Sequence, residues 1–322
     1  GEIGSVACKI YEKKSSNLPL TNKDVFIEIG PLFGTATESI IRGLLNNITR
    51  TTTNKLYVYD SFKCDIHNSL TQKIVSHANN LDILGCIQYK PNAWISFEKV
   101  FCHKLKTYIE SEHIIVVKGE SLRIKPPLDC SIAFMRVNIS KRYIDIKSFL
   151  FRFLSKTRIS SIIVYDDFFS HWSSSVMLAF GILISKKCLT IVESVDSSII
   201  FRVTRIPDNA ELLELDLLIQ NTNECLQFFD VISYECKKLK NEVPQVYLYT
   251  ITLAKIQLLY ERGKHEYASD ILVNFFDEQH ELSSIRKMID PYLDLLGNGF
   301  SVDKMYTENT RFTIPKSSMK II

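Results

Sequence analysis

Two short segments carry the residue types best suited to hold a nucleotide-like cofactor. One apolar run ends at Glu28 and Gly30, and a turn then leads to Gly34, where a helical pattern begins. A second apolar run, residues 55–59, ends on Asp60. A strand, a glycine turn, a crossover helix and a parallel strand with an acid at its tip form a unit that binds the ribose of such cofactors. The two segments therefore predict a site for a nucleoside-containing cofactor at the carboxyl ends of two strands.

Each of these residues suits one part of that task. Gly30 and Gly34 allow the backbone to approach a ligand closely, because a Cβ there would clash. Glu28 can orient the turn or meet the ammonium group of a cofactor. Asp60 can accept hydrogen bonds from both ribose hydroxyls; taken alone, it is explained equally well as a helix cap or a turn residue. The turn reads Gly-Pro-Leu-Phe-Gly rather than GxGxxG, which argues against a nicotinamide cofactor.

A second group of oxygen-bearing side chains follows two later apolar runs. Asp166 and Asp167 come directly after one run, and Asn138 ends another. Adjacent carboxylates repel one another unless a cation or a proton offsets them, and oxygen ligands suit Mg²⁺. The three residues therefore predict a magnesium site, with capping of the helical segment 171–186 as the alternative for the two aspartates. Strand alternation places Arg136 on the same face as Asn138, where we expect it to pair with an acid under the site.

These candidate residues need a scaffold of alternating strands and helices. The patterns predict strands over 24–29, 55–60, 113–118, 130–138 and 160–165, and an antiparallel pair over 189–194 and 198–205. They predict helices after Gly34 and over 65–79, 93–111, 143–154 and 171–186, with an exposed loop over 85–91. Such alternation is typical of a doubly wound, mostly parallel α/β sheet.

The β pattern stops after Pro207, and the chain then becomes helical. We therefore expect one domain over residues 1–207, an all-helical extension over 208–302 and a tail over 303–322. Residues 253–268 are similar to a single tetratricopeptide hairpin, and a dimerisation element is the simpler interpretation. The extension is expected to contact a second copy or another protein.

Residues 24–205 together resemble class I S-adenosylmethionine-dependent methyltransferases. The nearest subgroup is the macrocin O-methyltransferase-like enzymes, which methylate sugars on natural products and glycans. The resemblance rests on five segments in the family's order: 28–34, 59–62, 117–121, 132–138 and 163–168. It implies that S-adenosylmethionine contacts Glu28, Gly30, Gly34, Asp60, Ser61, Phe62, Gly119, Glu120 and Asn138.

The chain departs from this family at the metal site. Asn138 stands where the family has an aspartate, and Ser140 replaces the next acid. The resemblance implies that a metal held by Asn138, Asp166 and Asp167 draws a sugar hydroxyl toward the methyl donor. An amide cannot act as a base, so we expect weaker metal binding. His171, together with Asp167, is the replacement catalytic candidate because histidine titrates near neutrality; a partly exposed histidine at a helix start is the equal alternative.

Three functions follow from the motifs. The first is an O-methyltransferase that acts on a hydroxyl of a sugar, glycan or natural product with help from Mg²⁺. The second is a catalytically degenerate methyltransferase fold that serves as a binding or assembly module. The third is a metal-independent methyltransferase in which Asp166 and Asp167 are structural.

The composition bears on the binding partners of the protein, its redox environment and its relation to a membrane. The net charge of +3, from 39 basic and 36 acidic residues, is too balanced to indicate a nucleic-acid partner. The eight cysteines include no CxxC pair, which favours a reducing cytoplasm over disulfides or zinc. The longest apolar run, 176–184, is far shorter than the ~20 residues that span a bilayer. The first residue is not methionine, as expected of a fragment with further domains upstream.

Overall fold

The computed structural model describes residues 4–90, 94–139, 142–170, 173–239 and 245–277. The chain divides into two compact units, with the boundary after Ile251. Helices α8 (Asn209–Gln220) and α9 (Thr222–Lys238) belong to the first unit, where they pack against the helix α7 (Ser174–Ser185). The domain boundary expected after residue 207 stays a prediction.

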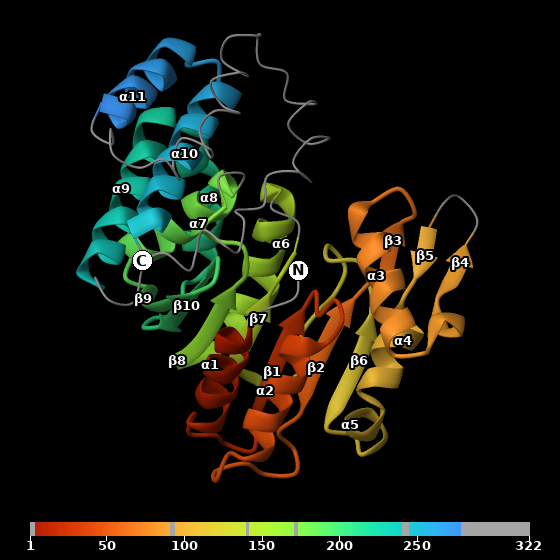
Figure 1. The fold of residues 1–322 in the computed structure, drawn as a ribbon. Helices are drawn as coiled ribbons and strands as arrows, with labels where there is room; N and C mark the ends of the chain where they lie inside the picture. The colour runs from red at the N-terminus through yellow and green to blue at the C-terminus, as the bar shows by residue number, and fades with distance from the viewer. Residues whose placement is uncertain (1–3, 91–93, 140–141, 171–172, 240–244, 278–322) are drawn as a thin grey trace. The chain divides into compact units, whose positions relative to one another are not determined.

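The described part of the first unit contains a seven-stranded sheet with the order β6-β2-β1-β7-β8-β10-β9 (Figure 1). Strands β6, β2, β1, β7 and β8 run parallel, and β10 runs antiparallel to β8 and to β9. The bounds are β1 (Asp24–Ile29), β2 (Leu56–Asp60), β6 (Ile114–Lys118), β7 (Ser131–Val137), β8 (Thr157–Tyr165), β9 (Leu189–Val195) and β10 (Ser198–Val203). The predicted doubly wound, mostly parallel sheet is confirmed, including the antiparallel pair.

The central strands are apolar because both of their faces are covered. All six residues of β1 are buried, as parallel strands between two helical layers require. Helices α1 (Ser5–Ser16), α2 (Thr35–Leu45) and α4 (Glu98–Lys104) cover one face, and α1 and α2 stand in front of the sheet in Figure 1. Their shared core includes Tyr11, Ile40 and Phe101 from the helices and Phe26, Val58 and Val164 from the strands.

The opposite face is covered by α6 (Tyr143–Phe153) and α7. The ring of Tyr59 in β2 packs edge-on against Phe153 of α6, with centroids 5.7 Å apart. Tyr165 of β8 packs in the same way against Phe180 of α7, at 5.1 Å. Helix α7 contacts the sheet on one side and α9 on the other, which explains why it is apolar on most of its surface.

A small antiparallel sheet lies between β2 and β6 in the sequence. Its order is β3-β5-β4, and its strands are β3 (Lys63–Asp65), β4 (Gln88–Lys90) and β5 (Trp94–Ser96). The predicted helix over 93–111 is wrong at its start, because Trp94–Ser96 pairs with both neighbouring strands before α4 begins at Glu98. The predicted loop over 85–91 is wrong in part for the same reason.

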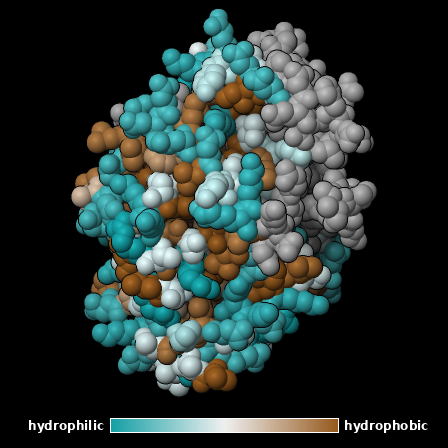
Figure 2. Space-filling view, turned by 90° about the vertical axis from the view of Figure 1, so that its left-hand side faces the viewer, coloured by the Kyte–Doolittle hydropathy of each residue, from teal (hydrophilic) through white to brown (hydrophobic). Residues whose placement is uncertain are grey.

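The remaining described elements are short or C-terminal. They are α3 (Ser69–Asn80), η1 (Leu84–Cys86), α5 (Lys106–Glu110), η2 (Leu154–Lys156), α10 (Gln245–Glu261) and α11 (His265–Asp277). Within the described ranges, no helix combines the length and apolar character needed to cross a membrane. The face drawn in Figure 2 intersperses hydrophilic residues with apolar ones.

Candidate functional site at the carboxyl edge of the sheet

The parallel strands all end at one edge of the sheet, and the strand order reverses at β1. The chain passes from β1 to β2 on one side, whereas β7 lies on the other side of β1. Ligands of doubly wound sheets bind outside the carboxyl ends of the strands at such a reversal. The ends of β1, β2, β7 and β8 are therefore the place to look for the predicted residues.

Asp60 ends β2 at this edge, next to the end of β1. Its side chain is half-buried, and its Oδ1 accepts a hydrogen bond from the backbone N–H of Phe62 at 2.7 Å. Burial raises the pKa of Asp60 to about 6, although the N–H groups of Phe62 and Ser61 act in the opposite direction. The carboxylate is thus mainly ionised at neutral pH and is suited to accept hydrogen bonds from a ligand.

Phe62 positions the carboxylate of Asp60 through its backbone N–H. The residue adopts a left-handed backbone with φ of 53°, and its side chain is fully buried. Its ring packs against Phe101 and Phe97, with centroid distances of 5.2 and 5.7 Å. Its carbonyl accepts a hydrogen bond from the N–H of Phe97 at 3.1 Å. Phe62 therefore acts on the site through its backbone N–H, while its ring belongs to the core.

The two glycines of the turn, Gly30 and Gly34, are packed closely against other atoms of the protein. Gly30 has a φ of 76°, and a Cβ there would lie 2.0 Å from the backbone oxygen of Asn138. Gly34 has a φ of 75°, and a Cβ there would meet the side chains of Leu105 and Phe101 at 2.9 and 3.0 Å. Both positions need glycine for the left-handed backbone and the close packing, whether or not a ligand is present.

Arg136 joins the ends of β1 and β8 across β7. Its side chain is 2% exposed, and its guanidinium contacts two buried carboxylates. Nη1 donates to Glu28 Oε1 at 2.5 Å, and Nη2 pairs with Asp166 Oδ2. Thr37 in the first turns of α2 donates its hydroxyl to the other oxygen of Glu28, also at 2.5 Å. The expected pairing of Arg136 with an acid under the site is confirmed, and Glu28 connects the turn to α2.

The pKa values in this network follow from burial and charge. Burial raises the pKa of Glu28, and Arg136 acts in the opposite direction. For Arg136, burial acts to lower the pKa, but Asp166 and Glu28 together raise it above its usual value. The guanidinium therefore stays charged, which stabilises two carboxylates that would otherwise be costly to bury.

Asp166 has partners on both of its oxygens. Oδ2 pairs with Arg136, and Oδ1 accepts hydrogen bonds from Ser198 Oγ at 3.1 Å and from the Tyr11 hydroxyl at 3.3 Å. Asp166 is 4% exposed and both of its oxygens already have protein partners, so a cation would have to displace some of these partners. The donor set predicted from Asn138, Asp166 and Asp167 therefore does not fit Mg²⁺. The described residues contain no group of three or more His, Cys, Asp or Glu side chains arranged to hold a metal ion.

The other predicted residues lie around the same edge. Gly119 donates its N–H to the carbonyl of Asp60 at 2.9 Å, and Asn138 donates its N–H to Ile29 at 2.8 Å. Asp167 is half-buried and accepts a hydrogen bond from Ser197 at 2.9 Å.

Two further predicted positions differ in what the structure describes. Glu120 is exposed and forms an ion pair with Lys63 at 3.6 Å. His171 lies outside the described residues, as does Ser140.

Three residues of the buried network had no role in the sequence interpretation. Thr37 is nine positions after Glu28 and lies within the first turn of α2, so a capping-type contact could have been considered. Tyr11 and Ser198 are 155 and 32 positions from Asp166, and no local pattern connects them to it.

The chain is similar in fold to solved methyltransferase structures. The O-methyltransferase NovP matches with 17% identity and a TM-score of 0.42, covering 62% of this chain and 80% of that one. The calicheamicin methyltransferase CalS11 matches with 13% identity and a TM-score of 0.40, covering 61% and 77%. An O-methyltransferase from Bacillus cereus matches with 11% identity and a TM-score of 0.39, covering 63% and 83%.

Sequence comparisons give no further relative. No protein-family model matches the chain, and no curated protein matches it. The fold class that the resemblance implied, a mostly parallel seven-stranded sheet flanked by helices, is nevertheless the one observed. Since the identities and TM-scores of the solved structures are low, the activity is argued from the residues of this chain.

Proposed function

We propose that this protein is an S-adenosylmethionine-dependent O-methyltransferase that acts on a hydroxyl of a sugar, glycan or natural product. The observation that carries the proposal is the position of Asp60. It is a half-buried, ionised carboxylate at the end of β2, beside the point where the strand order reverses. A carboxylate in this position suits the two ribose hydroxyls of an adenosyl group.

The surrounding residues support the same assignment. The turn after β1 lies next to Asp60, since Gly30 donates its N–H to the carbonyl of Tyr59 at 2.9 Å. Gly119 holds the opposite side of Asp60 through its own N–H. The backbone around the carboxylate is thus fixed before a ligand arrives, which lowers the entropy lost on binding.

The chemistry asked of the chain is mainly alignment. Bound S-adenosylmethionine supplies an activated methyl group, and the protein must orient the acceptor oxygen and exclude water. Asp167 is the described carboxylate at this edge that we assign to receive the proton of the acceptor, with His171 as the second candidate. No metal takes part in the proposal, because Asp166 is enclosed by its partners.

The first test measures cofactor binding by calorimetry in a matched pair of variants. Asp65 resembles Asp60 in two respects: it is half-buried at a strand end, and it accepts the N–H of the residue two positions on, His67, at 2.8 Å. Asp60→Asn is expected to weaken S-adenosylmethionine binding by about 30-fold, equivalent to ~2 kcal/mol for a charge-assisted hydrogen bond. Asp65→Asn is expected to leave the affinity unchanged. Absence of binding by the folded wild-type protein at millimolar cofactor would end the proposal.

A catalytically degenerate binding module is the second candidate. It is favoured by the enclosure of Asp166 and by Asn138, whose side-chain amide cannot act as a base. Both candidates predict cofactor binding, so the test is methyl transfer from S-adenosylmethionine to a panel of hydroxylated acceptors. Turnover that Asp60→Asn abolishes supports the enzyme, whereas binding without any turnover supports the module.

A further inference from the structure

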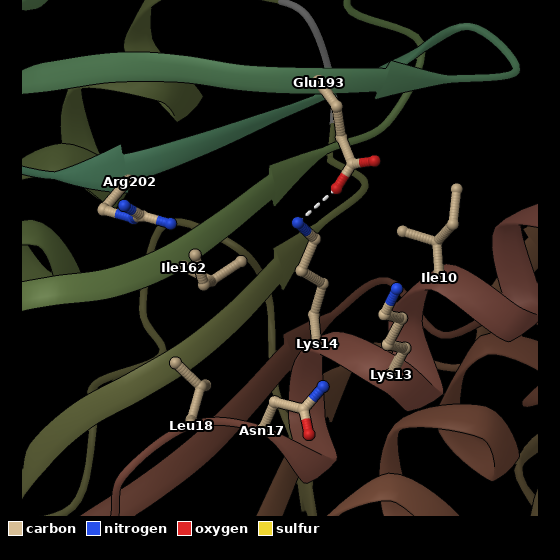
Figure 3. A pocket seen from close by; sticks show the side chains of 8 residues that line it. All are labelled: Ile10, Lys13, Lys14, Asn17, Leu18, Ile162, Glu193 and Arg202. Carbon is tan, nitrogen blue, oxygen red and sulfur yellow. Dashed lines mark ion pairs between the residues drawn. The ribbon is translucent and has the colours of Figure 1, made fainter. Parts of the chain in front are cut away.

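A cavity of about 310 Å³ lies between the end of α1 and the strands β8, β10 and β9 (Figure 3). Helix α1 and the residues that follow it form one wall, with Ile10, Lys13 and Lys14. The strands form the other wall, with Ile162 of β8 and Arg202 of β10. None of the lining residues belongs to the candidate site at the carboxyl edge of the sheet.

The charge of the lining is strongly unbalanced. Three cationic side chains, Lys13, Lys14 and Arg202, face one acidic side chain, Glu193. Lys14 forms an ion pair with Glu193, as the dashed line in Figure 3 shows. Lys13 and Arg202 have no ion-pair partner among the described residues, so the cavity carries two uncompensated positive charges. Such a lining favours an anion.

The most buried lining residues are apolar. Ile162 is 3% exposed and Leu18 is 8% exposed, and both contribute to the lining together with Ile10. An inorganic anion would leave these side chains without a partner, whereas an apolar group would remove their remaining surface from water. The volume is at the lower end of the range for small-molecule sites.

We propose that this cavity binds a small organic anion, with an apolar body against Ile10, Leu18 and Ile162 and an acidic head group attracted by the positive charges of Lys13 and Arg202, which lie on opposite sides of Lys14 in Figure 3. A phosphate ester or a carboxylate has the required chemistry, because lysine and arginine bind both. The site is separate from the proposed cofactor site and does not depend on it.

The test measures binding of octyl phosphate to the full chain by calorimetry. Lys13→Gln and Arg202→Gln are each expected to weaken binding about fivefold, the effect of one partly exposed ion pair. Both side chains are exposed, so the variants are expected to fold normally. Lys9→Gln is the matched control, because Lys9 is exposed on the same helix, one turn earlier, and does not line the cavity. It is expected to bind like the wild type.

Four further probes separate the contributions of head group and body. Octanoate is expected to bind through the same residues. Inorganic phosphate, octanol and octyltrimethylammonium are each expected to bind at least tenfold more weakly than octyl phosphate. The proposal is overturned if any of these three binds as tightly as octyl phosphate, if Lys9→Gln weakens binding as much as Arg202→Gln, or if the wild type fails to bind octyl phosphate at millimolar concentration.

Discussion

The carboxyl edge of the sheet has two halves that use acidic residues in different ways. At the ends of β1 and β8, Glu28 and Asp166 are buried and joined by Arg136. At the end of β2, Asp60 is half-buried and is held by the backbone N–H of Phe62. An enclosed carboxylate stabilises the fold, whereas a carboxylate that the backbone orients and that remains partly exposed can accept a ligand. Acidic residues at equivalent strand ends therefore need not share a function.

The largest effect on stability is expected when the positive charge of Arg136, which pairs with Glu28 and Asp166, is removed. Arg136→Met leaves two buried carboxylates without their cation, and we expect a loss of about 3–5 kcal/mol in the free energy of unfolding. Chemical denaturation measures this, with the exposed Arg123→Met as the control. The loss should shrink as the pH falls, because protonation neutralises the unpaired carboxylates. Equal stability of the two variants would show that the network is not structural.

A second pair of variants compares the two glycines of the turn. They have nearly the same φ, but a Cβ at Gly30 meets a backbone oxygen and a Cβ at Gly34 meets two side chains that can move. Gly34→Ala is expected to cost about 1–2 kcal/mol, the cost of a left-handed alanine. Gly30→Ala is expected to cost at least ~1 kcal/mol more. Equal unfolding free energies would contradict the close contact between Gly30 and Asn138.

The protonation of Asp60 at the end of β2 should affect the pH dependence of ligand binding. Because the pKa of Asp60 is raised to about 6, affinity for S-adenosylmethionine should fall as the pH drops below this value, approaching about tenfold per pH unit. Asp60→Asn should flatten this part of the profile. A wild-type profile that is already flat between pH 4.5 and 7 would separate Asp60 from binding.

The same group has the opposite effect on stability. The folded-state pKa of Asp60 lies above its ordinary value of 3.8, so the folded protein holds this proton more tightly. The stabilisation from Asp60 is therefore present at low pH and is lost as the pH rises toward 6. Denaturation of wild type and Asp60→Asn across this range measures the difference, and a wild-type advantage that grows with pH would contradict the shift.

The smallest effect on stability is expected for the hydrogen bond from Tyr11 to Asp166. Tyr11→Phe removes the hydroxyl that donates to Asp166, and we expect a loss of about 1 kcal/mol in the free energy of unfolding. Tyr89→Phe is the control, because Tyr89 is 66% exposed. A loss no larger than that of the control would mean that Ser198 alone satisfies this oxygen of Asp166.

The large sheet could be predicted from the sequence because its strands are long apolar runs. The run 24–29 and the pair around Asp196 gave the right strands, since five or more consecutive residues define a pattern. The three-residue strands β3, β4 and β5 are too short to show any period. Their pairing depends on contacts between Lys63, Ser96 and Gln88, which are distant in the sequence.

The positions of the candidate site residues could be predicted only where these residues lie within the last residues of a strand. Asp60 and Arg136 were placed correctly because strand ends and alternation fix their positions. The adjacent pair Asp166 and Asp167 predicted a metal site, but the chain turns at Asp167, with a φ of 52°, and the two side chains take different partners. The hydroxyl of Tyr11 arrives from another layer, so the enclosure of Asp166 follows only from the tertiary fold.

The aromatic contacts of Phe62 link the packing of the core to the affinity for any ligand that binds at Asp60. The N–H that orients the carboxylate belongs to Phe62, whose ring packs against both Phe97 and Phe101. Replacing Phe97 or Phe101 by a smaller residue would allow Phe62 to leave its left-handed conformation and would move the carboxylate of Asp60 from its position. Mutational scans of this protein will therefore find binding defects at side chains that no ligand ever touches.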